Sequence, residues 1–184
     1  ALRESNEEIN GLHAAIVSYL GELSRENLSE PQSQRLQRHL SEANYLANIG
    51  DMVEISLVEA GLQRARANLR ISDATEEILS NFHLEICRGL DRAIKSLVDR
   101  DPDLAAEVTG AKATIDELAA KADSHLSRRL VAGEPNRLIA FRLESELIEY
   151  LKRIFYFAKR IAKLATDDLP PTDEKVENAE SSDA

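Results

Sequence analysis

Two acidic residues, Asp51 and Glu54, lie three positions apart in the stretch YLANIGDMVE, residues 45–54. Residues three or four apart are neighbours on one face of a helix, and carboxylate oxygens are the ligands that hard divalent cations prefer. Glu42 is a further acidic residue of the same predicted helix, on the N-terminal side of Asp51. The stretch therefore predicts either a metal ligand at Asp51, with Glu54 as its helper, or an acidic helix face in contact with water.

Gly50 directly precedes Asp51 in the middle of the same predicted helix. A glycine in a helix interior costs about 1 kcal/mol relative to alanine, so its presence there needs a physical reason. Without a Cβ atom, a glycine allows a neighbouring helix or a ligand to approach the backbone closely. We therefore expect a close approach at Gly50.

His83 and Cys87 have the i, i+4 spacing of a ligand pair for a soft metal. A tetrahedral zinc site needs more ligands, and the other histidines have no motif spacing, which favours a small buried thiol beside a histidine. A carboxylate metalloenzyme of the helical-bundle type would require Glu-x-x-His pairs, and the sequence contains none. It also shows no catalytic triad and no Gly-rich phosphate loop, so we predict that the protein is not an enzyme.

The composition predicts that helices position these residues. The chain has 184 residues, with 43% hydrophobic residues, 4% aromatic residues, 7 glycines and 5 prolines. This profile is typical of one helix-rich domain, because sheets use more aromatic residues and turn glycines. A net charge of −10 argues against nucleic acid as a partner. The single cysteine excludes an internal disulfide, and the sequence contains no apolar run long enough to span a bilayer.

Start signals and apolar periodicity predict five long amphipathic helices. They begin at Ser5, at Ser29 with Pro31, at Asp73, at Asp101 with Pro102, and at Pro135, and they continue towards Leu23, Leu69, Leu97, Leu130 and Leu164. Gly133 is the expected C-terminal cap residue of the fourth helix. Because the connections are short, we predict an all-α antiparallel bundle over residues 1–166. Residues 167–184 are acidic, contain prolines and have no period, and we predict that this tail is disordered.

A short internal repeat links the second and fifth helices. Tyr45-Leu46-x-x-Ile49 in the second helix corresponds to Tyr150-Leu151-x-x-Ile154 in the fifth. The repeat indicates two related helical units, in which Leu46, Ile49, Leu151 and Ile154 have packing roles together with Gly50.

The segment NYLANIGDMVE resembles the signature helix of PhoU-type phosphate regulatory domains, and residues 101–130 are similar to the middle helix of a PhoU repeat. The stretch LHAAIVSYLGELSRENLSEPQSQRL resembles the C-terminal PhoU-like region of bacterial sodium/phosphate cotransporters. The resemblance implies a bundle of two three-helix repeats, the first of them truncated at its N-terminus. It also implies that the chain begins inside a longer polypeptide.

The resemblance further implies that a glutamate and an aspartate four residues apart bind a divalent or iron-type metal. In this sequence Asp51 is present, but the other three carboxylate positions are Ala47, Lys152 and Tyr156. We otherwise expect no cofactor. One hypothesis is that Lys152 replaces the metal and forms an ion pair with Asp51. The alternative is that Asp51 is solvated at a helix crossing and Lys152 extends outward.

The fifth helix is locally basic, with Lys152, Arg153, Lys159, Arg160 and Lys163 around the aromatic run 155–157. Three interpretations are open for these cations. They could face anionic lipid, bind phosphate or another anion, or form salt bridges to acidic neighbours such as Glu146 and Glu149. The aromatic run indicates either core or an interface.

By resemblance we expect the cytoplasmic regulatory domain of a sodium-dependent phosphate cotransporter. This fragment would itself be soluble and would lie on the cytoplasmic side of the membrane. Its partner would be the membrane transporter portion of the parent chain, and we also expect a homodimer, but no nucleic acid. The alternative is a standalone PhoU-like regulator of phosphate uptake or signalling that acts by protein–protein contacts.

Overall fold

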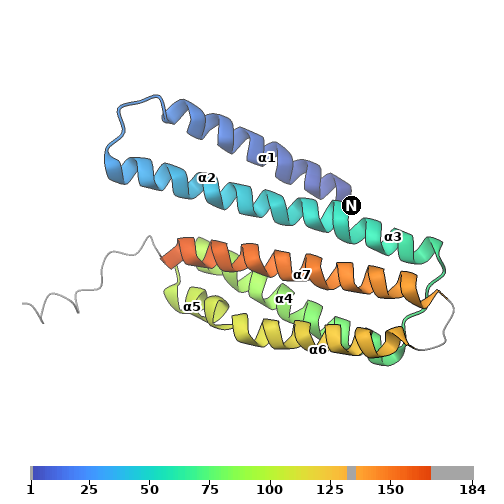
Figure 1. The fold of residues 1–184 in the computed structure, drawn as a ribbon. Coiled ribbons are helices and arrows are strands. Elements are labelled where there is room, and N and C mark those ends of the chain that lie inside the picture. Colours follow the sequence, from blue (N-terminus) through green and yellow to red (C-terminus); the bar gives the residue numbers. More distant parts are fainter. Residues whose placement is uncertain (1, 132–135, 167–184) are drawn as a thin grey trace, which may run out of the picture.

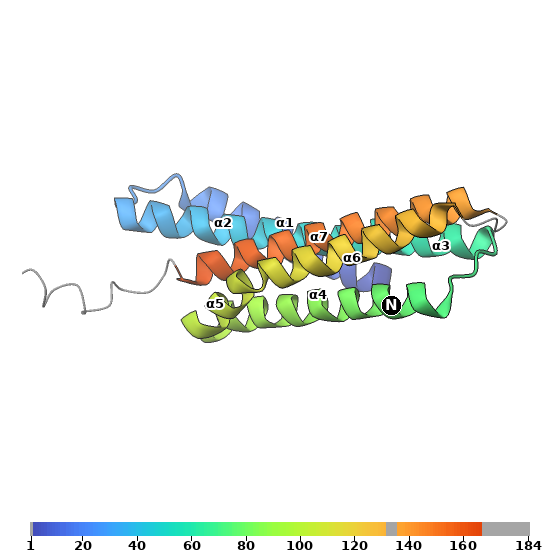
Figure 2. The same ribbon diagram turned by 60° about the horizontal axis from the view of Figure 1, so that its bottom comes forward.

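The computed structural model describes residues 2–131 and 136–166, and all elements within these ranges are helical. The helices run along one common axis and form an elongated bundle (Figures 1 and 2). They are α1 (Leu2–Leu23), α2 (Glu30–Asp51), the π-helix η1 (Met52–Leu57), α3 (Val58–Arg66), α4 (Asp73–Asp99), α5 (Pro102–Gly110), α6 (Lys112–Leu130) and α7 (Arg137–Thr166). The predicted all-α antiparallel bundle of long helices is therefore confirmed.

The bundle consists of a three-helix unit and a two-helix unit (Figure 1). In the three-helix unit, α4, the α5–α6 pair and α7 all pack against one another. In the other unit, α1 lies beside the continuous rod formed by α2, η1 and α3. The two units meet where α2, η1 and α3 contact α7, whereas α1 contacts α2 and η1 alone among the described elements. The helix α7 is therefore the centre of the bundle.

The hydrophobic core lies mainly between α4, α6 and α7. The largest side chains with almost no exposure are Phe82, Ile86, Leu126, Ile148, Leu151 and Ile161. Completely buried alanines stand between them at the helix contacts, namely Ala93, Ala105, Ala122, Ala158 and Ala162. Small side chains at these positions allow the helices to approach closely, so few aromatic residues are needed to fill the space between them.

Gly89 in α4 shows how closely α4 and α7 approach each other. A Cβ atom on Gly89 would lie 2.9 Å from the ring of Phe155, which is buried at 4% exposure. We expect Gly89→Ala to destabilise the protein, because overpacking against Phe155 costs about 1–3 kcal/mol. The higher helix propensity of alanine offsets about 1 kcal/mol of this cost. Urea unfolding measures the change. Gly11→Ala is the matched control, because nothing lies within 4 Å of its Cβ position and alanine there should stabilise α1.

Of two predicted helix starts, the one at Asp101 is confirmed and the one at Asp73 is displaced by one residue. Asp101 caps α5, and its Oδ1 atom accepts backbone N–H groups of Asp103 at 2.9 Å and Leu104 at 3.1 Å. The helix that we expected to begin at Asp73 is instead capped by Ser72, whose Oγ atom accepts the backbone N–H of Thr75 at 3.3 Å. The hydroxyl of Ser72 therefore provides the cap.

Other boundaries correct the sequence prediction. The first helix begins at Leu2, so Ser5 lies inside α1 and does not cap it. The fourth predicted helix is divided at Ala111 into α5 and α6. The second ends at Arg66, three residues before the expected end. Gly133, Pro135 and the tail 167–184 lie outside the described residues.

Candidate functional site

The predicted Gly50–Asp51 site lies where α2 changes into the π-helix η1. The rod keeps its course through this point, but residues 52–57 form the wider turns of a π-helix. A π-helical turn contains extra backbone, so it rotates the following side chains relative to a regular α-helix, and such turns are frequent at functional sites. The apolar period of residues 29–69 gives no sign of this π-helix.

Gly50 is needed because Asn6 of α1 packs directly on its backbone. A Cβ atom at position 50 would lie 2.5 Å from Asn6 Oδ1, and Asn6 is only 6% exposed. The side chain of Ile9 borders the same point at 3.5 Å. The close approach that we expected at Gly50 is therefore made by the side chains of α1.

Asp51 is bound by two amide side chains of α1. Its Oδ1 atom accepts hydrogen bonds from Asn6 Nδ2 at 3.1 Å and from Asn10 Nδ2 at 3.3 Å. Both bonds go to the same carboxylate oxygen, and neither donor carries a charge. The Oδ1 atom of Asn6 is buried and has no hydrogen-bond partner within the described part of the chain.

Two more polar contacts join α1 to the same rod. Arg3 Nε lies 3.5 Å from Glu54 Oε1, and His13 Nε2 lies 2.8 Å from Asn44 Oδ1. Together with the Asn6–Asp51 bond, these contacts form a polar ladder along an apolar seam. Asn6 is the buried member of this ladder, and it sets the register of α1 on α2, because a shifted register would leave its buried amide without the Asp51 partner.

The α1 residues of this ladder were missed by the sequence analysis, although the sequence contains a signal for two of them. The apolar positions of α1 follow a 4-3 spacing, and Asn6 and His13 occupy two of those positions. The full series is Leu2, Asn6, Ile9, His13, Ile16 and Leu20. A polar residue on an apolar stripe requires a partner on the facing helix, so this pattern indicates a specific helix pair.

An apolar groove of about 450 Å³ lies beside the ladder, between α1, α2 and α4. Its walls include Leu12 and Ile16 of α1, which are 66% and 41% exposed, and Ile94 of α4, which is 40% exposed. Asn6 and Glu54 are among the few polar residues that line it. The groove therefore gives one side of α1 an open apolar surface.

Lys152 does not meet Asp51 in the structure. Its Nζ atom lies 2.6 Å from Glu149 Oε1, and this hydrogen bond raises the pKa of Lys152, an effect that the charges of Asp123 and Asp116 reinforce. Asp123 and Asp116 belong to α6, so Lys152 lies on the α6 side of α7, whereas Asp51 lies towards α1. The predicted Asp51–Lys152 ion pair is therefore wrong. Lys152 pairs with Glu149, and Asp51 accepts hydrogen bonds from α1.

The residues around Asp51 do not fit the metal centre that the family resemblance implies. Asp51 is already bound by two amides, and Glu54 is paired with Arg3. The position of the missing glutamate is Ala47, which is buried. Across residues 2–131 and 136–166, no three His, Cys, Asp or Glu side chains are grouped so that they could hold a metal ion.

The remaining candidate residues lie either in the hydrophobic core or on an exposed face of α4. Ile49, Leu151 and Ile154 are buried in the core, and Leu46 packs against it. Cys87 Sγ lies 3.3 Å from His83 Nε2 on an exposed face of α4, and partial burial raises the pKa of this thiol. The small buried thiol that we expected at Cys87 is therefore wrong, because the pair faces solvent.

Comparison with known protein families gives a match to part of the chain. Residues 79–165 match the PhoU domain, a span that runs from within α4 to the end of α7 and includes most of the three-helix unit. No curated protein and no solved structure matches the chain. Within the described residues, every helix is too short or too polar to cross a membrane.

Proposed function

We propose, on the premise that residues 79–165 form a PhoU-like domain, that this chain is the cytoplasmic regulatory part of a sodium-dependent phosphate cotransporter. The PhoU family regulates phosphate transport and is not a family of enzymes. One observation carries the proposal. The PhoU-like unit packs against a second helical unit, and each unit contains one copy of the Tyr-Leu-x-x-Ile repeat. The resemblance of residues 12–36 to the cotransporter region supports the finer assignment.

Regulation of a transporter requires two states of the domain that bind the transporter with different affinity. The two-helix unit is suited to such a change, because α1 is attached only to α2 and η1 among the described elements. Only Asn6 and Leu20 of α1 are buried, so its docking depends on the polar ladder and a narrow apolar seam. A partner helix that entered the neighbouring groove would compete with or reinforce this docking.

The partner in this proposal is the transporter portion of the parent chain, contacted by helix packing on the apolar groove. A homodimer through the same groove is a further proposal, since exposed apolar patches commonly mark protein interfaces. Sedimentation of the purified chain over a range of concentrations distinguishes the two. A monomer at all concentrations leaves the groove to the transporter, and a concentration-dependent dimer assigns it to a second copy.

Deletion of the coding region for residues 1–184 from the native gene tests the proposed regulation. We expect sodium-dependent uptake of radiolabelled phosphate to persist, but no longer to decrease when cells are transferred to phosphate-rich medium. The reason is that the described part of the chain contains no membrane span and would only modulate transport. The control is a strain that carries Gly11→Ala, which leaves the helix surface and the regulation intact. An unchanged response of uptake to phosphate in the deletion strain would contradict the proposal.

The size and location of the native protein separate the cotransporter from a standalone PhoU-like regulator. An antibody against the purified chain should detect a membrane-bound protein much larger than 20.5 kDa, the mass of residues 1–184. A single band of about that mass, released without detergent, would instead establish the standalone regulator.

A further inference from the structure

The charges at the C-terminal end of the chain are arranged in two consecutive blocks of opposite sign. Residues 150–166, the second half of α7, contain five Lys or Arg residues and no acidic residue. Residues 167–184 contain seven acidic residues and one lysine. Blocks of like charge repel internally and attract the opposite block, so this order of charges favours an intramolecular contact.

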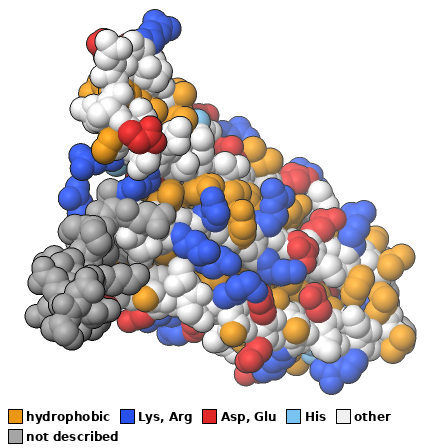
Figure 3. Space-filling model, turned by 60° about the vertical axis from the view of Figure 1, so that its left-hand side comes forward, with side chains coloured by type: hydrophobic (Ala, Val, Ile, Leu, Met, Phe, Trp, Pro, Cys, Tyr) orange, Lys and Arg blue, Asp and Glu red, His pale blue; other side chains and the backbone are white. Residues whose placement is uncertain are grey.

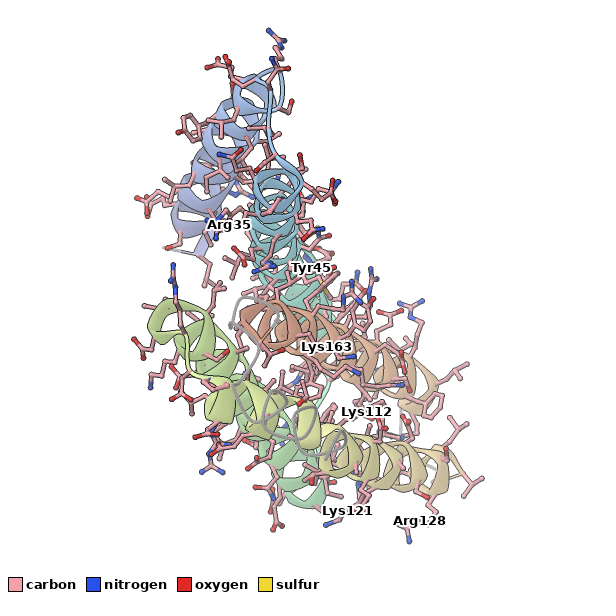
Figure 4. The ribbon with its side chains drawn as sticks, turned by 90° about the vertical axis from the view of Figure 1, so that its left-hand side faces the viewer. Arg35, Tyr45, Lys112, Lys121, Arg128 and Lys163 are labelled. Carbon is pink, nitrogen blue, oxygen red and sulfur yellow. The ribbon has the colours of Figure 1, made fainter. Side chains whose placement is uncertain are left out.

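On the surface of α7, the cations form a stripe with an exposed tyrosine at its centre. Arg153, Tyr156, Arg160 and Lys163 are all exposed and follow each other at intervals of three or four residues, so they share one helix face. Lys159 flanks them and is half-buried. We call these five residues the α7 stripe. Figure 3 shows Lys and Arg side chains gathered in the middle of one face of the molecule, and Figure 4 labels Lys163 at the end of α7.

Three cations of the α7 stripe are not neutralised by an acidic side chain of the described residues. Arg153, Lys159 and Lys163 have no ion-pair partner among the described residues. The two glutamates that we considered as partners are occupied, since Glu146 pairs with Arg142 at 3.7 Å and Glu149 pairs with Lys152 at 2.6 Å. Salt bridges to acidic neighbours therefore account for Lys152 of the basic helix. They do not account for Arg153, Lys159 and Lys163 of the stripe.

One cation of the stripe is held in place by an aromatic cluster. Arg160 Nε donates a hydrogen bond to Tyr45 Oη at 3.0 Å, and its guanidinium lies 5.6 Å from the centre of the Tyr45 ring. Tyr45 in turn packs against Phe157, and Phe157 against Tyr156. A guanidinium fixed in this way loses less side-chain entropy when it binds a carboxylate. The surface is thus preorganised for an anionic ligand.

We infer that the acidic segment 167–184 of the same chain binds to the α7 stripe and acts as its built-in anionic ligand. The segment follows Thr166 directly, three residues after Lys163. The stripe from Arg153 to Lys163 is about 15 Å long at 1.5 Å per residue, and an extended segment of this length reaches up to about 60 Å. It can therefore fold back along the whole stripe. A tether this short also gives an effective concentration of about a millimolar, which favours contacts that are individually weak.

This inference does not depend on the proposed function. The segment would cover the stripe until a stronger anion displaces it, and the contact should weaken with salt because it is made between exposed charges. Neutralisation of the acidic residues or reversal of the stripe charges should therefore have the same effect.

A spin label on the tail of the full chain tests the inference. Cys87→Ser with Ser182→Cys places one nitroxide near the end of the segment, and its broadening of backbone amide signals reports proximity by NMR. We expect at least several-fold stronger broadening at residues 153–163 than elsewhere in the bundle. The effect should disappear at about 0.5 M salt, where the screening length is a few ångströms.

Two charge-reversal variants of this labelled chain decide whether the contact is specific. Arg153→Glu, Lys159→Glu and Lys163→Glu together should abolish the broadening of α7. The matched control reverses three other cations, Arg25, Arg70 and Lys121, and should preserve the broadening. Lys121 points away from Lys163 in Figure 4, and none of the three has an ion-pair partner within the described ranges. Broadening that survives the stripe reversal, or that spreads evenly over the bundle, would overturn the inference.

Anionic vesicles test a different occupant of the same stripe. In the full chain, replacement of the tail acids by their amides should strengthen binding to phosphatidylserine vesicles several-fold, because the stripe is then uncovered. If the native and the amidated tail bound the vesicles equally strongly, the segment would not occupy the stripe, and lipid would be its ligand instead.

Discussion

Replacing Glu144 with leucine is expected to lower the free energy of unfolding by about 3–5 kcal/mol, because the change leaves a buried charge without its partner. Arg137 Nη2 lies 2.8 Å from Glu144 Oε2, and the Nη1–Oε1 distance is 3.4 Å. The two side chains are only 5% and 7% exposed. Arg137 is the first residue of α7, and its Nε atom has no partner within the described residues, so Glu144 provides the only described ion pair of this guanidinium.

Urea unfolding of three variants isolates the contribution of this pair. The double variant Arg137→Met with Glu144→Leu should recover most of the lost stability, since a well-packed apolar pair often replaces a buried ion pair without loss. Asp91→Leu is the matched control, because the Asp91–Lys95 pair at 2.9 Å is solvent-exposed and should contribute less than about 1 kcal/mol. If Glu144→Leu cost no more than Asp91→Leu, the pair would not anchor the start of α7.

The second large effect is expected at Gly50. Gly50→Leu should undock α1, because its Cβ position is 2.5 Å from Asn6 Oδ1 and the Asn6 side chain is enclosed. The change combines overpacking with the loss of the Asn6–Asp51 hydrogen bond, which together amount to about 2–4 kcal/mol. The loss cannot exceed the free energy with which α1 docks. We therefore expect the amides of α1 to lose protection from hydrogen exchange, while those of α4 keep it.

A glycine without neighbours provides the control for this experiment. Gly11→Leu lies in the same helix as Asn6 but has nothing within 4 Å of its Cβ position, so α1 should stay protected. Asn6→Ala combined with Gly50→Ala should cost less than the sum of the two single changes, because alanine at position 6 removes the group that clashes. Additive effects of these two changes would show that the contact between Asn6 and Gly50 does not hold α1.

The fold was predictable because its signals are local. The apolar period, the start positions and the short connections predicted five helical segments. The structure contains them, but the second includes the π-helix η1 and the fourth is divided at Ala111. The Asp101 cap was predictable for the same reason, since it involves only the next three residues. The resemblance to PhoU domains agrees with the family match at residues 79–165.

The candidate site was only partly predictable. Gly50 was correctly singled out as a point of close approach, because a glycine inside a helix weakens that helix unless a neighbour needs the space of the missing side chain. The partners of Asp51 were not found, because Asn6 and Asn10 are 45 and 41 residues away along the chain. Nor did the spacing of Lys152 reveal that it faces Glu149 and the acidic residues of α6.

The sequence by itself determined which segments are helical, which face of each is apolar, and that opposite charges are grouped in α7 and the tail. These properties follow from the order of neighbouring residues along the chain. Tertiary structure decided that Asn6 fills the space over Gly50, that Asp51 binds amides, and that the α7 stripe keeps cations without an ion-pair partner among the described residues. Such pairings depend on how far each packed helix is rotated about its axis and shifted along it. A small rotation of one helix is enough to bring a different side chain opposite the neighbouring helix.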